Sequence, residues 1–157
     1  MCLDYLNPIK AVRGYGFKTV NSTEVPDEFV GRWPYFSIDS GGCLSDKKTH
    51  RNCVVWKLGR MYRVKHKRIT RTERMGTRYP AGVHLYRYFD KAFNTNRVTL
   101  VCYYTSGLYQ DQEQVVAMRC TPLLALRTRS QKEIFKGLIK SYGVKRAIEV
   151  FKKRYAD

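Results

Sequence analysis

Alternating apolar and polar positions in the middle of the chain predict two long β-strands. The apolar positions of the first strand are Val98, Leu100, Cys102 and Tyr104. After a turn at Ser106 and Gly107, a second apolar run extends from Gln114 to Cys120. Successive side chains of a strand point to opposite faces, so this period-two pattern is typical of strands that bury one face. Pro122 is expected to end the sheet-forming region.

Shorter runs predict the other elements of this part of the chain. Strands are expected at residues 17–20, 54–64 and 83–87, and one or two helical turns at 88–93. Gly14 and Gly16 are expected to serve a turn before the first strand, and Gly59 to bend the second. Residues 21–53 carry several prolines and glycines and are predicted to be irregular.

The C-terminal part changes to the period of an α-helix. The apolar positions on one face of the first helix are Ile134, Phe135, Leu138, Ile139 and Tyr142. Ser130 is the expected N-cap, with Glu133 completing a capping box, and Gly143 is the expected C-cap. A second helix is predicted over residues 144–155, with its cations on the outer face.

Together these elements predict an α+β fold, an antiparallel β-sheet body of about five strands with a C-terminal α-helical hairpin. The body is expected to cover residues 1–125 and to contain a basic loop within 47–78. Residues 126–157 are expected to form the basic helical hairpin, either packed on the body or at the interface of a homodimer.

Charge is concentrated in two regions of the chain. The net charge is +17, from 30 Lys and Arg against 13 Asp and Glu. Residues 47–78 hold 12 basic residues and one acid, and residues 127–157 hold ten basic residues and three acids. Like charges that a fold brings together repel one another, and a phosphate-bearing partner removes that cost while it releases counterions. A phosphate-rich ligand, which is a nucleic acid or a nucleotide, is therefore the leading interpretation.

Aromatic residues interleave with the cations and extend this interpretation. Tyrosines can stack on bases while Lys and Arg contact phosphates, as in proteins that bind single-stranded RNA or DNA. The expected phosphate ligands in the first region are Arg60, Arg63, Lys65, Lys67, Arg68, Arg71 and Arg74, with Tyr62, Tyr79 and Tyr86 as stacking partners. The expected ligands in the helical hairpin are Lys145, Arg146, Lys152 and Lys153.

Composition excludes several other classes of protein. With 43% hydrophobic and 13% aromatic residues, the chain can form a packed core, which a disordered basic tail cannot. No apolar run approaches the roughly 18 residues of a membrane span, and the first residues lack the layout of a secretory signal. We therefore expect a cytoplasmic protein without membrane contact.

The cysteines and acids do not form a recognisable metal or cofactor site. The five cysteines are odd in number and lack close pairs, which argues against a disulfide framework. Cys43, His50 and Cys53 lack a fourth zinc ligand. Cys102 and Cys120 lie in apolar runs and are expected to be small buried side chains. No metal and no cofactor is predicted, and the interpretation leans towards a protein that is not an enzyme.

One arrangement offers an enzymatic alternative. Gly82 to Tyr86, a short helix with Ala92, a strand to Tyr104 and then Asp111 to Val116 resemble, in order and spacing, the His and Glu strands of ADP-ribosyltransferases. The resemblance implies an active site in which His84 binds NAD and Glu113 polarises the ribose. Under this alternative, Glu113→Gln abolishes activity.

A second resemblance concerns origin. The segments that carry it are 14–18, 56–59, 79–84 with Ala92, and 115–119. Over about residues 14–122 the chain resembles a group of small bacteriophage accessory proteins. The resemblance implies a viral protein with an anti-defence role, so the phosphate-rich ligand is a nucleic acid or a nucleotide signal that the protein sequesters. A module that binds an acidic host protein is the third alternative.

Overall fold

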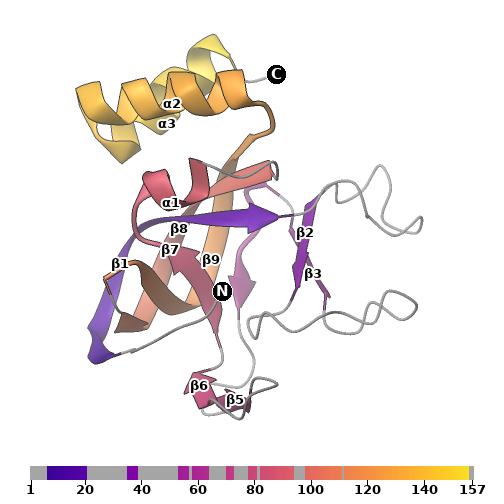
Figure 1. Ribbon diagram of the computed structural model, residues 1–157, viewed down its shortest axis with the longest axis vertical. Helices are drawn as coiled ribbons and strands as arrows, with labels where there is room; N and C mark the ends of the chain where they lie inside the picture. Colours follow the sequence, from indigo (N-terminus) through magenta and orange to yellow (C-terminus); the bar gives the residue numbers. More distant parts are fainter. Residues whose placement is uncertain are drawn as a thin grey trace.

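The computed structural model describes residues 7–20, 35–38, 53–56, 58–63, 70–72, 78–80, 82–93, 98–110 and 112–155 (Figure 1). A β-sheet forms the centre of this part, and two C-terminal helices cover one side of it. The predicted α+β fold, a five-stranded antiparallel sheet with a C-terminal helical pair, is confirmed.

The strands vary greatly in length. They are β1 (Asn7–Val20), β2 (Tyr35–Ile38), β3 (Cys53–Trp56), β4 (Tyr62–Arg63), β5 (Thr70–Thr72), β6 (Arg78–Pro80), β7 (Val83–Tyr86), β8 (Val98–Gln110) and β9 (Gln114–Leu126). The helices are α1 (Phe89–Phe93), α2 (Arg129–Tyr142) and α3 (Val144–Arg154). The pairs β2–β3 and β5–β6 form two small antiparallel ribbons beside the main sheet (Figure 1).

The main sheet closes on itself. Strand β9 pairs with β8 along one edge and with β7 and β4 along the other. Strand β7 in turn pairs with β1, and β1 pairs with β8. The pairings thus return to the strand from which they start, and the curled sheet has an inner and an outer face.

Strand β1 begins earlier than the sequence predicts, and Gly14 and Gly16 lie within it instead of forming a turn. The reason is a close approach across the curled sheet. A Cβ atom at Gly16 would lie 2.9 Å from the Cβ atom of Leu85, and one at Gly14 would lie 3.2 Å from the Tyr104 hydroxyl oxygen. The two glycines therefore make room for larger side chains of facing strands.

Strand β9 continues past Pro122 to Leu126, so the prediction that this proline ends the sheet is wrong. Pro122 lies at an irregularity, because the register between β8 and β9 shifts between Val101 and Cys102. A bulge tolerates a residue without an N–H donor. The carbonyl oxygen of Pro122 still accepts a hydrogen bond, from the Gly59 N–H at 2.7 Å.

The single strand predicted over 54–64 is divided into β3 and β4. Gly59 adopts φ +82° in the turn that separates them, a conformation that favours glycine. The segment 65–75, predicted as a loop, contains β5, and the rest of it lies outside the described residues.

The helical pair begins at a different cap from the one predicted. The N-cap of α2 is Thr128 instead of Ser130, and the capping box pairs Thr128 with Gln131 instead of Glu133. Thr128 Oγ1 accepts a hydrogen bond from the Gln131 N–H at 3.1 Å, which satisfies a donor of the first turn. Gly143 ends α2 as predicted, with φ +80° and its N–H bonded to the Ile139 oxygen.

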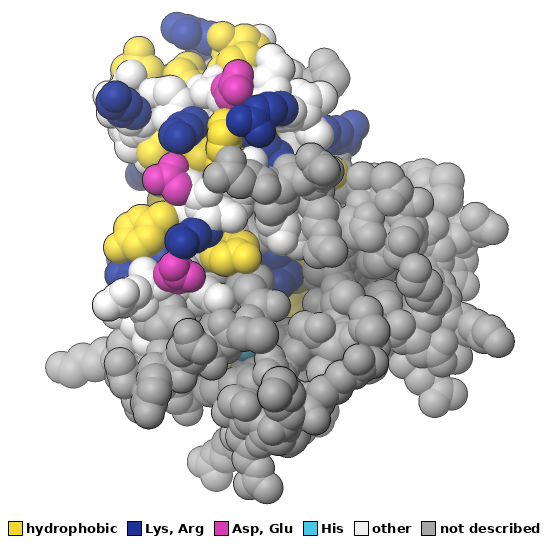
Figure 2. Space-filling view, in the orientation of Figure 1, with side chains coloured by type: hydrophobic (Ala, Val, Ile, Leu, Met, Phe, Trp, Pro, Cys, Tyr) yellow, Lys and Arg dark blue, Asp and Glu magenta, His cyan; other side chains and the backbone are white. Residues whose placement is uncertain are grey.

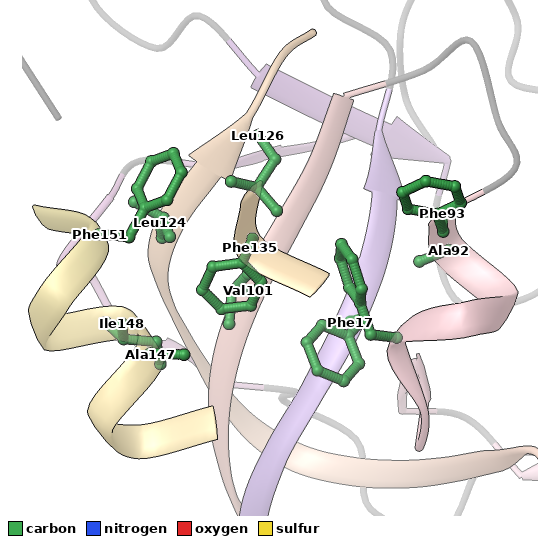
Figure 3. Packing of buried hydrophobic residues seen from close by; sticks show 11 residues of the cluster. Phe17, Ala92, Phe93, Val101, Leu124, Leu126, Phe135, Ala147, Ile148 and Phe151 are labelled. Atoms are coloured by element: carbon green, nitrogen blue, oxygen red, sulfur yellow. The ribbon is translucent and has the colours of Figure 1, made fainter. Parts of the chain in front are cut away.

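Helices α1, α2 and α3 pack on the outer face of the sheet through a cluster that we call the helix-side cluster. Its members include Phe17, Phe89, Val101, Leu124, Leu126, Phe135, Ala147, Ile148 and Phe151 (Figure 3). Four phenylalanines connect the layers in series, because the ring centroids of Phe17 and Phe89, of Phe89 and Phe135, and of Phe135 and Phe151 lie 5.2, 5.4 and 5.9 Å apart. Edge-to-face contacts of this kind are favourable beyond the burial of area.

A second cluster, the inner cluster, fills the other face of the curled sheet. It joins Val20, Trp56, Val83, Leu85, Val98, Leu100, Cys102, Val115 and Cys120. Cys102 and Cys120 are buried free thiols, so their prediction as small buried side chains is confirmed. Lys18 is also buried, and its Nζ donates a hydrogen bond to the His84 oxygen at 3.2 Å.

Two glycine substitutions test the close approach inside the sheet. Gly16→Ala places a methyl group against Leu85, so we expect the free energy of unfolding to fall by about 1–3 kcal/mol. Gly137→Ala, in α2, meets no atom within 4 Å and removes a flexible residue from a helix, so we expect a gain of roughly 0.5–1 kcal/mol. Urea denaturation measures both changes, and equal effects of the two substitutions would contradict the packing described for Gly16.

Candidate nucleic-acid interface

Among the predicted ligands whose side chains the structure describes, the cations on α3 form the largest exposed group. Lys145, Arg146, Lys152 and Lys153 are all exposed on this helix, and Arg154 extends the set. Figure 2 shows Lys and Arg side chains gathered over the helices, with fewer acidic side chains between them. Within the described part of the chain, the one ion pair of α3 joins Arg146 Nη1 to Glu149 Oε2 at 2.9 Å.

Unlike the α3 cations, most cations on α2 contact other side chains, and two of them connect α2 to α1. Lys136 Nζ lies 3.7 Å from Asp90 Oδ1 of α1 and 4.8 Å from the centre of the Phe93 ring. Arg129 stacks over the same ring at 5.1 Å and pairs with Glu133. Burial lowers the pKa of Lys132 in the same helix, and the charge of Arg129 lowers it further. These contacts make most of the α2 cations part of the packing.

Strand β4 and the turn before it place part of the first basic region at the sheet. Arg60 and Arg63 are exposed, whereas Tyr62 is half-buried and its ring packs edge-on against Trp56, with centroids 5.2 Å apart. Tyr62 therefore contributes to the inner cluster, which competes with its predicted role as a stacking partner.

The ribbon β5–β6 brings two predicted site residues together. Arg71 and Tyr79 are direct partners in the register of its antiparallel ladder. Tyr86 lies in β7, half-buried against the helix-side cluster. Lys65, Lys67, Arg68 and Arg74 lie outside the described residues.

The structure adds residues that the sequence analysis missed. Arg119 of β9 lies directly opposite Arg63, and Tyr103 of β8 lies directly opposite Tyr15 of β1. The two tyrosine rings meet edge-on, with centroids 5.4 Å apart. A regional charge count could not find Arg119, because it stands alone in an apolar run and gains its neighbour only through strand pairing.

His84 and Glu113, the residues of the ADP-ribosyltransferase alternative, lie on neighbouring parts of the β7–β9 ladder. His84 is buried in β7 opposite Val116 of β9, whereas the backbone carbonyl oxygen of Glu113 accepts a hydrogen bond from the Arg87 N–H, three residues farther along the ladder. Three residues of a strand span about 10 Å. Glu113 is half-exposed and pairs with Lys91 at 2.7 Å, a contact that raises the pKa of Lys91.

Other classes of site were sought in the described part of the chain. No cluster of three or more His, Cys, Asp and Glu side chains there could hold a metal ion. No helix of that part is long and apolar enough to cross a membrane. Comparisons with family models, curated proteins and solved structures found no match.

The buried thiols give a test of the inner cluster. Burial raises the pKa of Cys102 well above its usual range, and the neighbouring Cys120 raises it further. Because both thiols are buried, we expect iodoacetamide at about pH 8 to leave Cys102 and Cys120 unmodified in the native protein and to alkylate both in urea. Peptide mass mapping measures the modification at each position. Equal alkylation of native and unfolded protein would contradict the burial of these thiols.

Proposed function

We propose that the protein binds a phosphate-rich ligand, in the first place a nucleic acid, and catalyses no reaction on it. The observation that carries this proposal is the exposed cationic surface of α3. Lys145, Lys152 and Lys153 have no acidic partner among the described residues, whereas Asp90, Glu113, Glu133 and Glu149 each hold another cation. Solvated surfaces usually mix charges of both signs, so this separation favours a polyanionic ligand.

The positions of these cations along α3 support the same proposal. Lys145 and Lys152 are seven residues apart, as are Arg146 and Lys153, so each pair lies on one strip of the helix about 10 Å apart. Lys145 and Arg146 also stand in the first turn, which contains no acid. Cations there oppose the helix dipole, and a bound phosphate would offset that cost.

The likeness to small bacteriophage proteins suggests a biological setting for such binding. In that setting the protein acts against host defence, either on a nucleic acid or by sequestering a nucleotide signal. Both forms need cations for phosphates and aromatic rings for bases. They differ in the number of phosphates contacted, so the salt dependence of binding separates them.

Neutralising the α3 surface tests the proposal. We expect the triple variant Lys145→Gln, Lys152→Gln and Lys153→Gln to bind duplex DNA of about 20 base pairs more weakly. The slope of log K against log salt should fall in magnitude by about 2–3, since each phosphate contact contributes about 0.9. Fluorescence anisotropy across a salt series measures both quantities.

The control variant removes the same charge elsewhere. Lys91→Gln, Arg129→Gln and Lys136→Gln delete three cations that already have acidic partners, so the salt slope should stay close to that of the wild type. Equal slopes for all three proteins, or no binding of nucleic acid by the wild type, would refute the proposal. A shallow slope with selective binding of a cyclic dinucleotide would favour the sequestering form, and nuclease-resistant capture of an acidic protein would favour the protein-binding alternative.

A further inference from the structure

Five side chains on the outer face of the sheet form a surface that the charge pattern of the sequence does not reveal. We call it the arginine–tyrosine face, and it consists of Arg13, Tyr15, Arg63, Tyr103 and Arg119. Arg119 is the direct partner of Arg63 on one side and of Thr105 on the other. Tyr103 is the direct partner of Tyr15. The face therefore runs across β4, β9, β8 and β1.

Strand alternation places these residues on one side of the sheet. Tyr62, Cys120 and Tyr104, which neighbour Arg63, Arg119 and Tyr103 in sequence, pack into the inner cluster. The arginines and Tyr103 consequently point to the outer side. Tyr15 packs against the helix-side cluster, and Arg13 lies two residues before it in the same strand, next to a register shift.

The face begins where the helices stop covering the sheet. Phe17 and Val101 stand two residues beyond Tyr15 and Tyr103, and both are buried in the helix-side cluster. In the opposite direction the side chains become accessible. Tyr15, Tyr103 and Arg119 are half-buried, and Arg13 and Arg63 are exposed.

The acids of the described residues are paired elsewhere, away from the arginines of this face. Within the described residues, no acidic side chain pairs with Arg13, Arg63 or Arg119. Like charges directly opposite each other in an antiparallel pair are destabilising, and Arg63 and Arg119 stand in that relation. A bound phosphate would neutralise both guanidinium groups, which are suited to hold it in a bidentate manner.

The tyrosines supply the other half of a nucleotide site. Their ring centroids lie 5.4 Å apart with an interplanar angle of 62°, so the rings meet edge-on and offer two adjoining aromatic surfaces, which together we call the platform. Along the strands the platform lies two residues, or roughly 7 Å, from the row of arginines. Bases that stack on the platform would thus have their phosphates directed towards the arginines. A duplex cannot use such a platform, because its bases are already stacked and paired.

We propose that the arginine–tyrosine face binds single-stranded nucleic acid, with bases stacked on Tyr15 and Tyr103 and phosphates held by Arg13, Arg63 and Arg119. The inference rests on the proposed function for the class of ligand and adds a second surface and a preference for single strands. Stacking tolerates every base, so the binding is expected to be largely independent of sequence.

The test compares single strands with duplex. We expect Tyr103→Leu, which keeps an apolar side chain against Tyr15, to weaken binding of single-stranded RNA and DNA of about 12 nucleotides by roughly 5- to 100-fold. Binding of duplex DNA should stay within about twofold, and Tyr103→Phe should bind like the wild type. Arg119→Gln should weaken binding of single strands and lower the salt slope by about 0.7.

Matched controls remove the same groups from other places. Tyr88→Leu deletes an exposed tyrosine next to α1, and Arg129→Gln deletes a cation of α2 that pairs with Glu133. Both should bind single strands like the wild type. Since Tyr103→Leu could unfold the sheet, the wild-type protein is also crosslinked by ultraviolet light to a 4-thiouridine oligonucleotide, and the crosslinked peptides should contain Tyr15 or Tyr103.

The outcomes separate this inference from the proposed function. If the wild type binds no polynucleotide, both fail. If it binds single strands and the α3 triple variant weakens that binding while Tyr103→Leu and Arg119→Gln do not, the proposed function stands and the arginine–tyrosine face is overturned. Crosslinks that map only to α3 overturn it equally.

Discussion

Contact among four phenylalanines joins the main sheet to the three described helices. Phe17 belongs to β1, Phe89 to α1, Phe135 to α2 and Phe151 to α3, and each ring meets the next edge-on. Helices of the length of α2 and α3 are marginal in water by themselves, so they depend on this packing. The burial of Phe135 and Phe151 fixes which side of each helix faces the sheet. It therefore also determines that the α3 cations face outwards.

Local pattern was enough to predict part of this arrangement and failed where distant segments meet. The period of β8 and of α3 is regular because each buries one face, and α3 was predicted correctly. Strand β8 was predicted up to a turn at Ser106 and Gly107, which is wrong, because the strand continues through both residues to Gln110. Gly14 and Gly16 were predicted to form a turn, because the sequence does not show that Leu85 and Tyr104 of other strands pack against them and leave no room for a side chain. Pro122 was predicted to end the sheet, because the bulge that accommodates it depends on the register between β8 and β9, which the sequence does not show.

The candidate site divides in the same way. The exposure of the α3 cations follows from the helical period alone, since they stand opposite the apolar stripe of the helix. Arg119 and Tyr103 could not be recognised, because each lies in an apolar strand and acquires its role only from Arg63 and Tyr15, which lie far away in sequence. For Tyr62 the prediction erred in the other direction. Its position between arginines suggested a stacking partner for a base, whereas its ring packs against the inner cluster.

The distribution of acids links the stability of the fold to its proposed ligand. Asp90 of α1 forms an ion pair with α2, and Glu113 forms one with Lys91. Glu133 and Glu149 form ion pairs with arginines of their own helices. Exposed pairs of this kind contribute little to stability, yet they leave no acid in the described part for Lys145, Lys152 and Lys153 of α3 or for the arginine–tyrosine face. The repulsion that remains is a cost of the free protein, and a polyanion that relieves it would bind the folded state and stabilise it. Under the proposed function, binding and folding are therefore coupled, and the coupling weakens as salt screens the cations.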